Sequence, residues 1–320
     1  IDGMAELGLR LPSSRLGWIF MAIGQALRFA VSRRPRPEGD PRRLRDAELA
    51  HLTALVTLEL FFAVRLLDMM VISLLSANLA ERSGSYGPSA SAYNNLAYLF
   101  GLVGAEAAST RLFARARMGD VRGQSRSYIS QGLLALGRAD FAGAEALFAR
   151  AQSVGEEAGD RFIAASAISA IGTVCELRGD FAAALRQADV LAESARLSGN
   201  RRFELWAEVA RGTAYTLLGR DADALIWISR RGDDLAEEDI LTTVGVHGLR
   251  AYAYLRAGRL ADALTHAERA TAQIRRTGPG VFTHIKALTG VAETYLAAWA
   301  DDLSKRPGTA SAHEKPARKA

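Results

Sequence analysis

The stretch GRADFAGAEALFARA, residues 137–151, recurs along this 320-residue chain and decides its fold. Related segments begin at residue 102 (LVGAEAASTRLFARA), residue 177 (LRGDFAAALRQADVL), residue 217 (LLGRDADALIWISRR) and residue 256 (RAGRLADALTHAERA). Aligned, they share one equivalent position, which we call the anchor: Gly104, Ala139, Gly179, Gly219 and Gly258, at spacings of 35, 40, 40 and 39 residues. A fixed period in this range indicates a stack of supersecondary units, each too small to bury its apolar face alone.

Residues of similar size recur at fixed distances from the anchors. Seven residues before them stand Ala97, Gly132, Gly172, Gly212 and Ala251; five after them stand Ser109, Ala144, Ala184, Ala224 and Ala263; nine after them stand Phe113, Phe148, Ala188, Ile228 and Ala267. A small residue on one helix lets a second helix approach closely, and a glycine anchor can adopt a positive φ that ends the first helix. The pattern predicts pairs of antiparallel helices joined at the anchors.

The order small, small, then mostly apolar is typical of tetratricopeptide repeats. HEAT-like helix pairs have a similar period but do not explain this spacing. The period near 40 exceeds the usual 34 by about six residues, or more than one helical turn. We therefore predict an all-α fold, a right-handed α-solenoid of tetratricopeptide-like helix hairpins.

The same pattern suggests four regions: a helical lead-in (1–32), an Arg/Pro-rich linker (33–46), the repeat array (47–300) and a basic tail (301–320) that reads as a truncated repeat. The first copy is the least regular, with expected helices at 51–64 and 67–81 and a loop at 82–88. After the last anchor we expect a helix at 261–276, a stop at 277–280 and a further first helix at 282–299. The chain begins at Ile1 and ends in KPARKA without a helix stop signal, which favours a segment of a longer protein.

The net charge of +5 is concentrated in one segment. The stretch from Arg28 to Arg45, which includes RRPRPEGDPRRLR, supplies all of it, so the basic charge does not mark a face of the fold. We read this segment as a solvated, mobile linker and expect no direct nucleic-acid partner; contact with an anion or a membrane surface is the alternative.

Two apolar stretches are poor candidates for membrane spans. The run Trp18 to Val31 has only 14 residues and contains Gln25 and Arg28, and it reads as a buried helix. The run 58–79 contains Glu59, Arg65 and Asp68. With no recognisable signal peptide and a single cysteine, the sequence predicts no membrane span and a cytoplasmic location.

Motifs that carry chemistry are missing from the sequence. It has no phosphate-binding GxxxxGK[ST], no nucleophile elbow GxSxG, and no HExxH or CxxC. The five histidines never stand four residues apart, and Cys175 falls at a core position of the repeat. We expect no catalytic residue, no metal and no cofactor, and therefore a chain that is not an enzyme.

A binding surface is the remaining functional possibility. In tetratricopeptide arrays the concave face is lined by first helices, and the register set by the anchors places seven residues there: Asn94, Tyr98, Arg126, Glu176, Trp206, Thr213 and Tyr252. Such side chains suit recognition of a protein or peptide. For Trp206 and Tyr252 the alternative is packing between repeats. If they bind, Trp206→Ala and Tyr252→Ala should weaken partner capture without unfolding the chain.

Several segments resemble one family of bacterial proteins. They are SAYNNLAYLFGLVGAEAASTRLFARA (91–116), RGDFAAAL (178–185), AGRLADAL (257–264), GVAETYLAAWADD (290–302) and the lead-in GLRLPSSRLGWIFMAI (8–23). These segments are similar to the C-terminal helical repeat region of large signalling proteins that begin with a class III adenylate/guanylate cyclase domain, followed by an AAA-type predicted ATPase domain. The chain contains neither the metal-binding aspartates of the cyclase nor Walker motifs.

The resemblance implies a non-catalytic scaffold that binds a protein or effector, including the cyclase and ATPase domains of its own parent. An alternative parent is a MalT-like ATPase transcription regulator, whose sensor repeats are also near 40 residues. Its DNA-binding module is not visible in this sequence. A third possibility, an independent enzyme, predicts turnover of ATP or GTP by the isolated chain.

Overall fold

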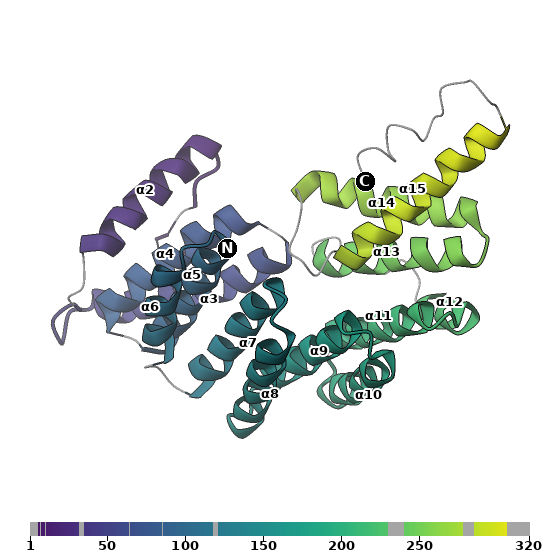
Figure 1. Ribbon diagram of the computed structural model, residues 1–320. Coiled ribbons are helices and arrows are strands. Elements are labelled where there is room, and N and C mark those ends of the chain that lie inside the picture. Colours follow the sequence, from purple (N-terminus) through teal and green to yellow (C-terminus); the bar gives the residue numbers. More distant parts are fainter. Residues whose placement is uncertain are drawn as a thin grey trace. The chain divides into compact units, whose positions relative to one another are not determined.

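The computed structural model describes residues 6, 8–9, 11–31, 35–63, 65–84, 86–117, 121–229, 240–277 and 285–305. Within these ranges the chain forms fourteen α-helices and no strand (Figure 1). Consecutive helices pack against each other as hairpins, which confirms the predicted all-α fold. In the same residues, no helix combines the length and the apolar character that crossing a membrane requires.

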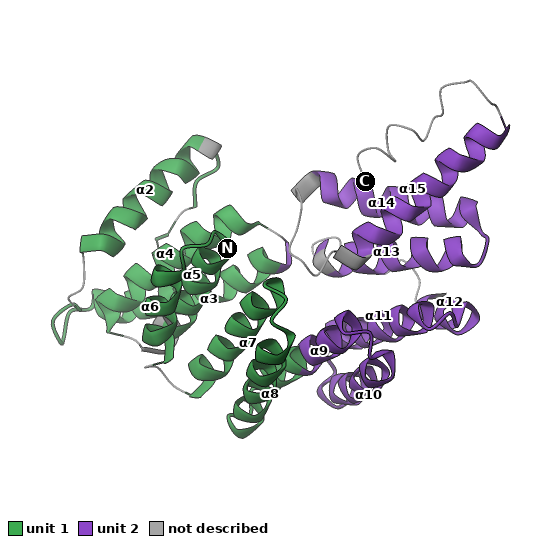
Figure 2. Cartoon of the chain, in the orientation of Figure 1, with its two compact units in different colours: residues 1–61, 65–167 green, residues 62–64, 168–320 purple. Residues whose placement is uncertain are grey.

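The chain divides into two compact units, coloured separately in Figure 2. Unit 1 comprises residues 1–61 and 65–167, and unit 2 comprises residues 62–64 and 168–320. Unit 1 holds α2 (Arg15–Val31), most of α3 (Arg42–Phe62), α4 (Leu66–Ser83), α5 (Tyr86–Leu102), α6 (Glu106–Arg117), α7 (Val121–Gly137), α8 (Phe141–Glu157) and the start of α9 (Arg161–Leu177). Unit 2 holds the rest of α9, then α10 (Phe181–Ser198), α11 (Arg201–Leu217), α12 (Asp221–Ser229), α13 (Ile240–Arg256), α14 (Leu260–Thr277) and α15 (Ile285–Lys305).

Each anchor lies at the bend of a hairpin. All five have a positive φ: 78° at Gly104, 60° at Ala139, 79° at Gly179, and 73° at both Gly219 and Gly258. The residue after two of these bends caps the second helix, since the Asp140 and Asp180 carboxylates accept hydrogen bonds from the backbone N–H of Gly143 and Ala183, both 2.9 Å long. The sequence therefore predicted the positions of the bends correctly.

The small residues before the anchors allow the close approach within each hairpin. A Cβ added to Gly132 of α7 would lie 2.4 Å from the Phe148 ring of α8, and one added to Gly212 of α11 would lie 2.8 Å from Ile228 of α12. Such contacts exclude any side chain. At Gly172 the nearest atom, of Gln187, is 3.4 Å away, so that hairpin is less tight.

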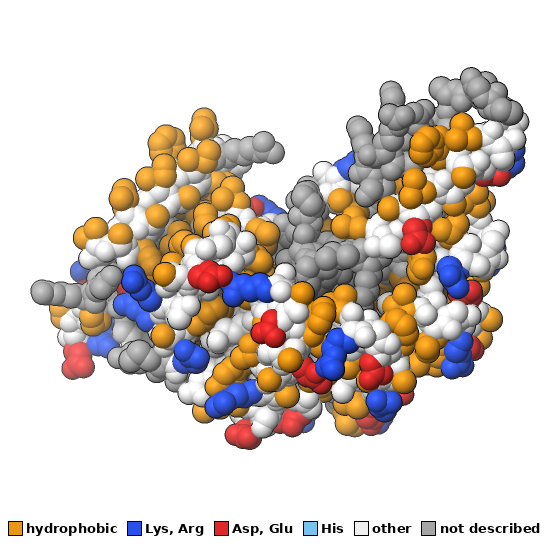
Figure 3. All heavy atoms as spheres, in the orientation of Figure 1, with side chains coloured by type: hydrophobic (Ala, Val, Ile, Leu, Met, Phe, Trp, Pro, Cys, Tyr) orange, Lys and Arg blue, Asp and Glu red, His pale blue; other side chains and the backbone are white. Residues whose placement is uncertain are grey.

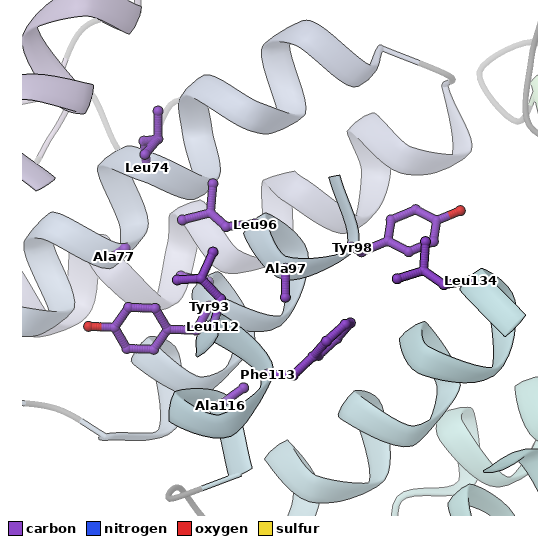
Figure 4. Packing of buried hydrophobic residues seen from close by; sticks show 11 residues of the cluster. Leu74, Ala77, Tyr93, Leu96, Ala97, Tyr98, Leu112, Phe113, Ala116 and Leu134 are labelled. Atoms are coloured by element: carbon purple, nitrogen blue, oxygen red, sulfur yellow. The ribbon is translucent and has the colours of Figure 1, made fainter. Parts of the chain in front are cut away.

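The core of unit 1 lies where α4, α5, α6 and α7 meet (Figure 4). Leu96 and Ala97 of α5 are fully buried there against Leu112 and Phe113 of α6. Ser109, which replaces the alanine of the other copies, donates a 2.7 Å hydrogen bond to the Ala97 carbonyl. This bond joins the two small-residue positions of one hairpin.

Some expected boundaries were wrong. The loop expected at 82–88 is shorter than predicted, because α4 continues to Ser83 and α5 begins at Tyr86. Pro88 is accommodated in the first turn of α5, where a backbone N–H has no helical partner. Helix α15 continues past Trp299 to Lys305, whose ammonium pairs at 2.6 Å with Asp301 one turn earlier. Of the stop expected at 277–280, Thr277 is the last residue of α14, whereas residues 278–280 and the tail after Lys305 lie outside the described residues.

The Arg/Pro-rich segment makes more contacts than its composition predicts. Helix α3 begins at Arg42, inside the expected linker. The side chain of Asp46 is 8% exposed and pairs with Arg36 at 2.8 Å and with Arg82 of α4 at 3.3 Å. Arg43 donates a 2.7 Å hydrogen bond to the Ser83 carbonyl at the end of α4. Residues 35–46 therefore pack against the C-terminal end of α4.

Candidate functional site

Three of the residues predicted to bind a partner lie on neighbouring first helices of unit 1. Asn94 and Tyr98 stand one turn apart on α5, and Arg126 lies on α7. The Asn94 amide donates hydrogen bonds to Ser130 Oγ (2.9 Å) and to the Arg126 carbonyl (3.3 Å). Its own carbonyl oxygen, Oδ1, is buried and has no hydrogen-bond partner among the described residues.

Arg126 supplies the positive charge of this region. Its guanidinium contacts Ser91 Oγ at 3.4 Å and Asp160 at 3.7 Å, while its Nε is buried without a hydrogen-bond partner in the described part of the chain. The Asp160 carboxylate also accepts a 3.2 Å hydrogen bond from the Ile163 N–H at the start of α9. The side chain of Arg126 is 41% exposed and that of Asp160 only 11%, so an incoming group would reach the guanidinium first.

We refer to Ser91, Asn94, Arg126, Ser130 and Asp160 together as the polar cluster. It offers two hydroxyls, an amide, one partly exposed cation and one largely buried carboxylate. These groups can hold a polar ligand by hydrogen bonds and by charge. The arrangement is therefore suited to holding a ligand.

Tyr98 lies one turn beyond Asn94 on the same face of α5. Its ring packs edge-on to Phe61, with centroids 6.3 Å apart, and beside Leu134 (Figure 4). Its hydroxyl is buried and has no partner among the described residues, and burial raises the pKa of this phenol well above its ordinary value of 10.0. The hydroxyl therefore remains protonated near neutral pH and can serve as a donor.

In unit 2, Trp206 is engaged in packing between hairpins. Its indole N–H on α11 donates a 2.8 Å hydrogen bond to Thr242 Oγ1 on α13, and the Phe203 ring meets it edge-on at 5.3 Å. This geometry favours the packing alternative over a free binding surface for Trp206.

Most of the other predicted binding residues of unit 2 are buried or already hydrogen-bonded within the chain. Thr213 Oγ1 donates to the Val209 carbonyl of its own helix at 2.8 Å, and Glu176 on α9 is buried. Tyr252 on α13 is half-buried where α13 meets α15, since a Cβ added to Gly290 would lie 2.8 Å from Tyr252 Cβ. These side chains do not form a shared cluster comparable to that in unit 1.

Ser91, Ser130 and Asp160 were not among the residues predicted from the sequence. A signal for two of them was present. The contacts Arg126–Ser91, Asn94–Ser130 and Trp206–Thr242 join residues 35, 36 and 36 positions apart, close to one repeat period. Comparing polar residues one period apart on consecutive first helices would have found these pairs.

A histidine pair was also missed. His247 of α13 is buried, and its Nδ1 lies 3.1 Å from Nδ1 of His266 on α14. The ring of Tyr254 is also stacked on that of His266, with centroids 5.5 Å apart. The two histidines are 19 residues apart in sequence and meet because α13 and α14 form a hairpin.

No group of three or more potential metal ligands occurs in the described ranges. Neither protein-family models nor curated proteins gave a match to this chain.

Proposed function

We propose that this chain is a non-catalytic helical-repeat scaffold that binds an extended peptide segment of a partner protein at the polar cluster. The repeat identity that we propose is tetratricopeptide-like. Its support is the spacing of the small residues, the positive φ at all five anchors, and the contact between the positions seven before and nine after an anchor, as in Gly132 with Phe148.

The observation that carries the proposal is the set of unsatisfied polar atoms beside a partly exposed cation. Asn94 Oδ1, the Tyr98 hydroxyl and Arg126 Nε are buried and unpaired among the described residues. Each unpaired buried polar group costs about 1–3 kcal/mol. Native proteins retain few such groups, and a bound ligand or water is one way in which they obtain a partner.

The chemistry of these atoms points to a peptide. Asn94 Oδ1 accepts, so it suits a backbone N–H, whereas the Tyr98 hydroxyl suits a backbone carbonyl. The Arg126 guanidinium suits a carboxylate, which binds it in a bidentate fashion more strongly than the 3.7 Å contact with Asp160. The ligand that fits best is an extended segment with an acidic side chain or a C-terminal carboxylate.

We further propose that the partner segment belongs to a cyclase or ATPase domain of a larger signalling protein. The support is the sequence resemblance of residues 8–23, 91–116 and 290–302 to the repeat region of such proteins. As a scaffold, the chain should form neither cyclic nucleotide nor free phosphate when it is incubated alone with ATP or GTP and Mg²⁺. Turnover above a no-protein control would contradict the non-catalytic assignment.

The binding proposal is tested by selecting ligands from a phage-displayed library of random 12-residue peptides on the purified chain. Affinities of the enriched peptides are then measured by fluorescence anisotropy for the wild-type chain and for Arg126→Ala and Asn94→Ala. Loss of one interaction with a charged group, about 2 kcal/mol, corresponds to a loss of affinity of at least tenfold.

Matched controls are available on the same helices. Arg122→Ala removes an exposed arginine one turn before Arg126, and Asn95→Ala removes the neighbour of Asn94. Both should leave affinity within about twofold of wild type. The proposal is wrong if no peptide is enriched, or if the Arg126 and Arg122 variants lose affinity equally.

A further inference from the structure

The helix α2 has two apolar faces, and other described residues of the chain cover one of them. On the covered face Trp18 and Met21 pack into a cluster with α3 and α4, and the Phe29 ring lies 6.2 Å from Tyr93 of α5. Gln25 is also buried on this face, where it accepts two hydrogen bonds from the Asn78 amide. These contacts fix which face of α2 points away from unit 1. The sequence-based expectation of a fully buried helix was therefore wrong.

The outward face carries a continuous row of large apolar side chains. The row, which we call the α2 stripe, consists of Leu16 (68% exposed), Ile19 (50%), Phe20 (72%), Ile23 (53%), Leu27 (63%) and Val31 (83%). Figure 3 shows hydrophobic side chains gathered along this helix. Single exposed apolar residues are ordinary on protein surfaces, but six on one helix face form a patch that marks an interaction site.

We infer that the α2 stripe is the interface of a homodimer, in which it packs against the same stripe of a second copy of this chain. The spacing supports a helical partner: Leu16, Phe20, Ile23 and Leu27 follow one another at intervals of four, three and four residues. This is the alternation that lets two helices interlock along a seam. A C2 pair in which the same patch faces itself is the commonest way in which chains associate.

The exposed area is sufficient for such a pair. At these exposed fractions the six side chains present on the order of 700 Å² per copy, so covering most of the stripe on both copies removes more than the roughly 1,000 Å² that a specific interface needs. The stripe itself carries no charge, so pairing buries no unpaired ion.

Charge also sets the direction of the pairing. Arg28 is the one charged residue between residues 16 and 31, and it is exposed beside the stripe. In a parallel pair the two Arg28 side chains lie near each other and repel, whereas an antiparallel pair separates them. The dimer is therefore antiparallel, with Phe20 of one copy facing Leu27 of the other.

The first test is the molar mass of the chain in solution, measured by sedimentation equilibrium over a concentration series. We expect a mass twice the 34.4 kDa of one chain, and a shift toward one chain mass for Leu27→Asp. Leu197→Asp is the matched control, because Leu197 is a 66%-exposed leucine on α10, remote in sequence from the stripe. Both positions are exposed, so neither change should disturb folding, which circular dichroism verifies.

A disulfide test fixes the direction. Mixing Phe20→Cys and Leu27→Cys chains, both with Cys175→Ser to remove the native thiol, under mild oxidation should give a crosslinked pair, while each variant alone should crosslink much less. A wild-type chain that stays monomeric at every concentration overturns the proposal. So does a dimer that survives Leu27→Asp, or a monomer that instead binds phospholipid vesicles through the stripe.

Discussion

At the scale of single residues, the anchor positions show how one backbone angle defines a repeat. Gly104, Gly179, Gly219 and Gly258 have a positive φ, and a Cβ added to any of them would meet no atom within 4 Å. The requirement for glycine there is therefore conformational and not steric. Ala139 adopts the same region at a φ of 60°, where an L-residue pays about 1–2 kcal/mol.

Exchanging the two residue types should have opposite effects on stability. Gly179→Ala should lower the free energy of unfolding by about 1 kcal/mol because alanine is strained at a positive φ. Ala139→Gly should raise it by the order of 0.5 kcal/mol, since relief of strain is partly offset by the greater freedom of glycine in the unfolded chain. Urea denaturation measures both. Changes of the same sign would show that these bends are not equivalent.

The glycines seven residues before the anchors have a different role, which is steric. Gly132→Ala should lower the free energy of unfolding by about 1–3 kcal/mol, because the new Cβ would lie 2.4 Å from the Phe148 ring. Gly137→Ala on the same helix is the control, since no atom lies within 4 Å of its added Cβ. It should be neutral or stabilising by up to about 1 kcal/mol. Equal destabilisation by both changes would contradict the close-approach argument.

Asp40 gives a pH-dependent prediction. Hydrogen bonds from the side chain and the backbone of Arg42 lower the pKa of this carboxyl from 3.8 to about 2. Because the folded-state pKa is the lower one, the contribution of Asp40 to stability is complete above pH 3.8 and is lost as the pH falls through 2. Carbon-13 NMR of the carboxyl group should show a midpoint near 2, and Arg42→Ala should return it toward 3.8. An unchanged midpoint would exclude the Arg42 side chain as a cause, since the backbone N–H of residue 42 is retained in this variant.

At the scale of elements, consecutive first helices are joined by contacts between residues about one period apart. The pair Trp206 and Thr242 joins α11 to α13 in unit 2, and the pair Asn94 and Ser130 joins α5 to α7 in unit 1. Arg126 and Trp206 occupy equivalent positions, each thirteen residues before its anchor. In unit 1 this repeat position holds an arginine whose Nε has no hydrogen-bond partner among the described residues. In unit 2 it holds a tryptophan whose indole N–H is hydrogen-bonded.

Trp206→Phe and Thr242→Val should each destabilise unit 2 by about 1 kcal/mol, the usual net value of a hydrogen bond. The double variant should cost less than the sum of the two, because either change alone breaks the same bond. Chemical denaturation of the three variants completes the cycle. If the two single changes in the free energy of unfolding add up to that of the double variant, the indole N–H does not bond to Thr242 in solution. Trp206 would then again be a candidate for binding a partner.

At the scale of the whole chain, the hairpin pattern was predictable because it depends on local features. The small residues and the bend residue lie within each copy, and the comparison of copies shows the period. The partners in the polar cluster were not predictable from single copies. Whether Asn94 finds Ser130, or Asp160 reaches Arg126, depends on which side chains neighbouring hairpins present, and no local pattern encodes that.

The exposure of one face of α2 could not be predicted from the sequence either, because it also depends on which other elements pack against the helix. The run from Trp18 to Val31 is apolar on both sides, and hydrophobicity alone predicts burial all round. Among the described residues, packing partners cover the face with Trp18, Met21 and Phe29. Composition identifies an apolar surface but does not say whether a partner from the same chain is available to cover it.

The most direct test of the central claim is an NMR titration of the isotope-labelled chain with the tightest peptide from the library selection. If the peptide binds at the polar cluster, the largest changes in chemical shift should fall on the Asn94 side-chain amide, the Arg126 Nε–H and the backbone of α5 and α7 around them. Changes confined to second helices such as α8 or α10, with the Asn94 and Arg126 signals unmoved, would contradict it.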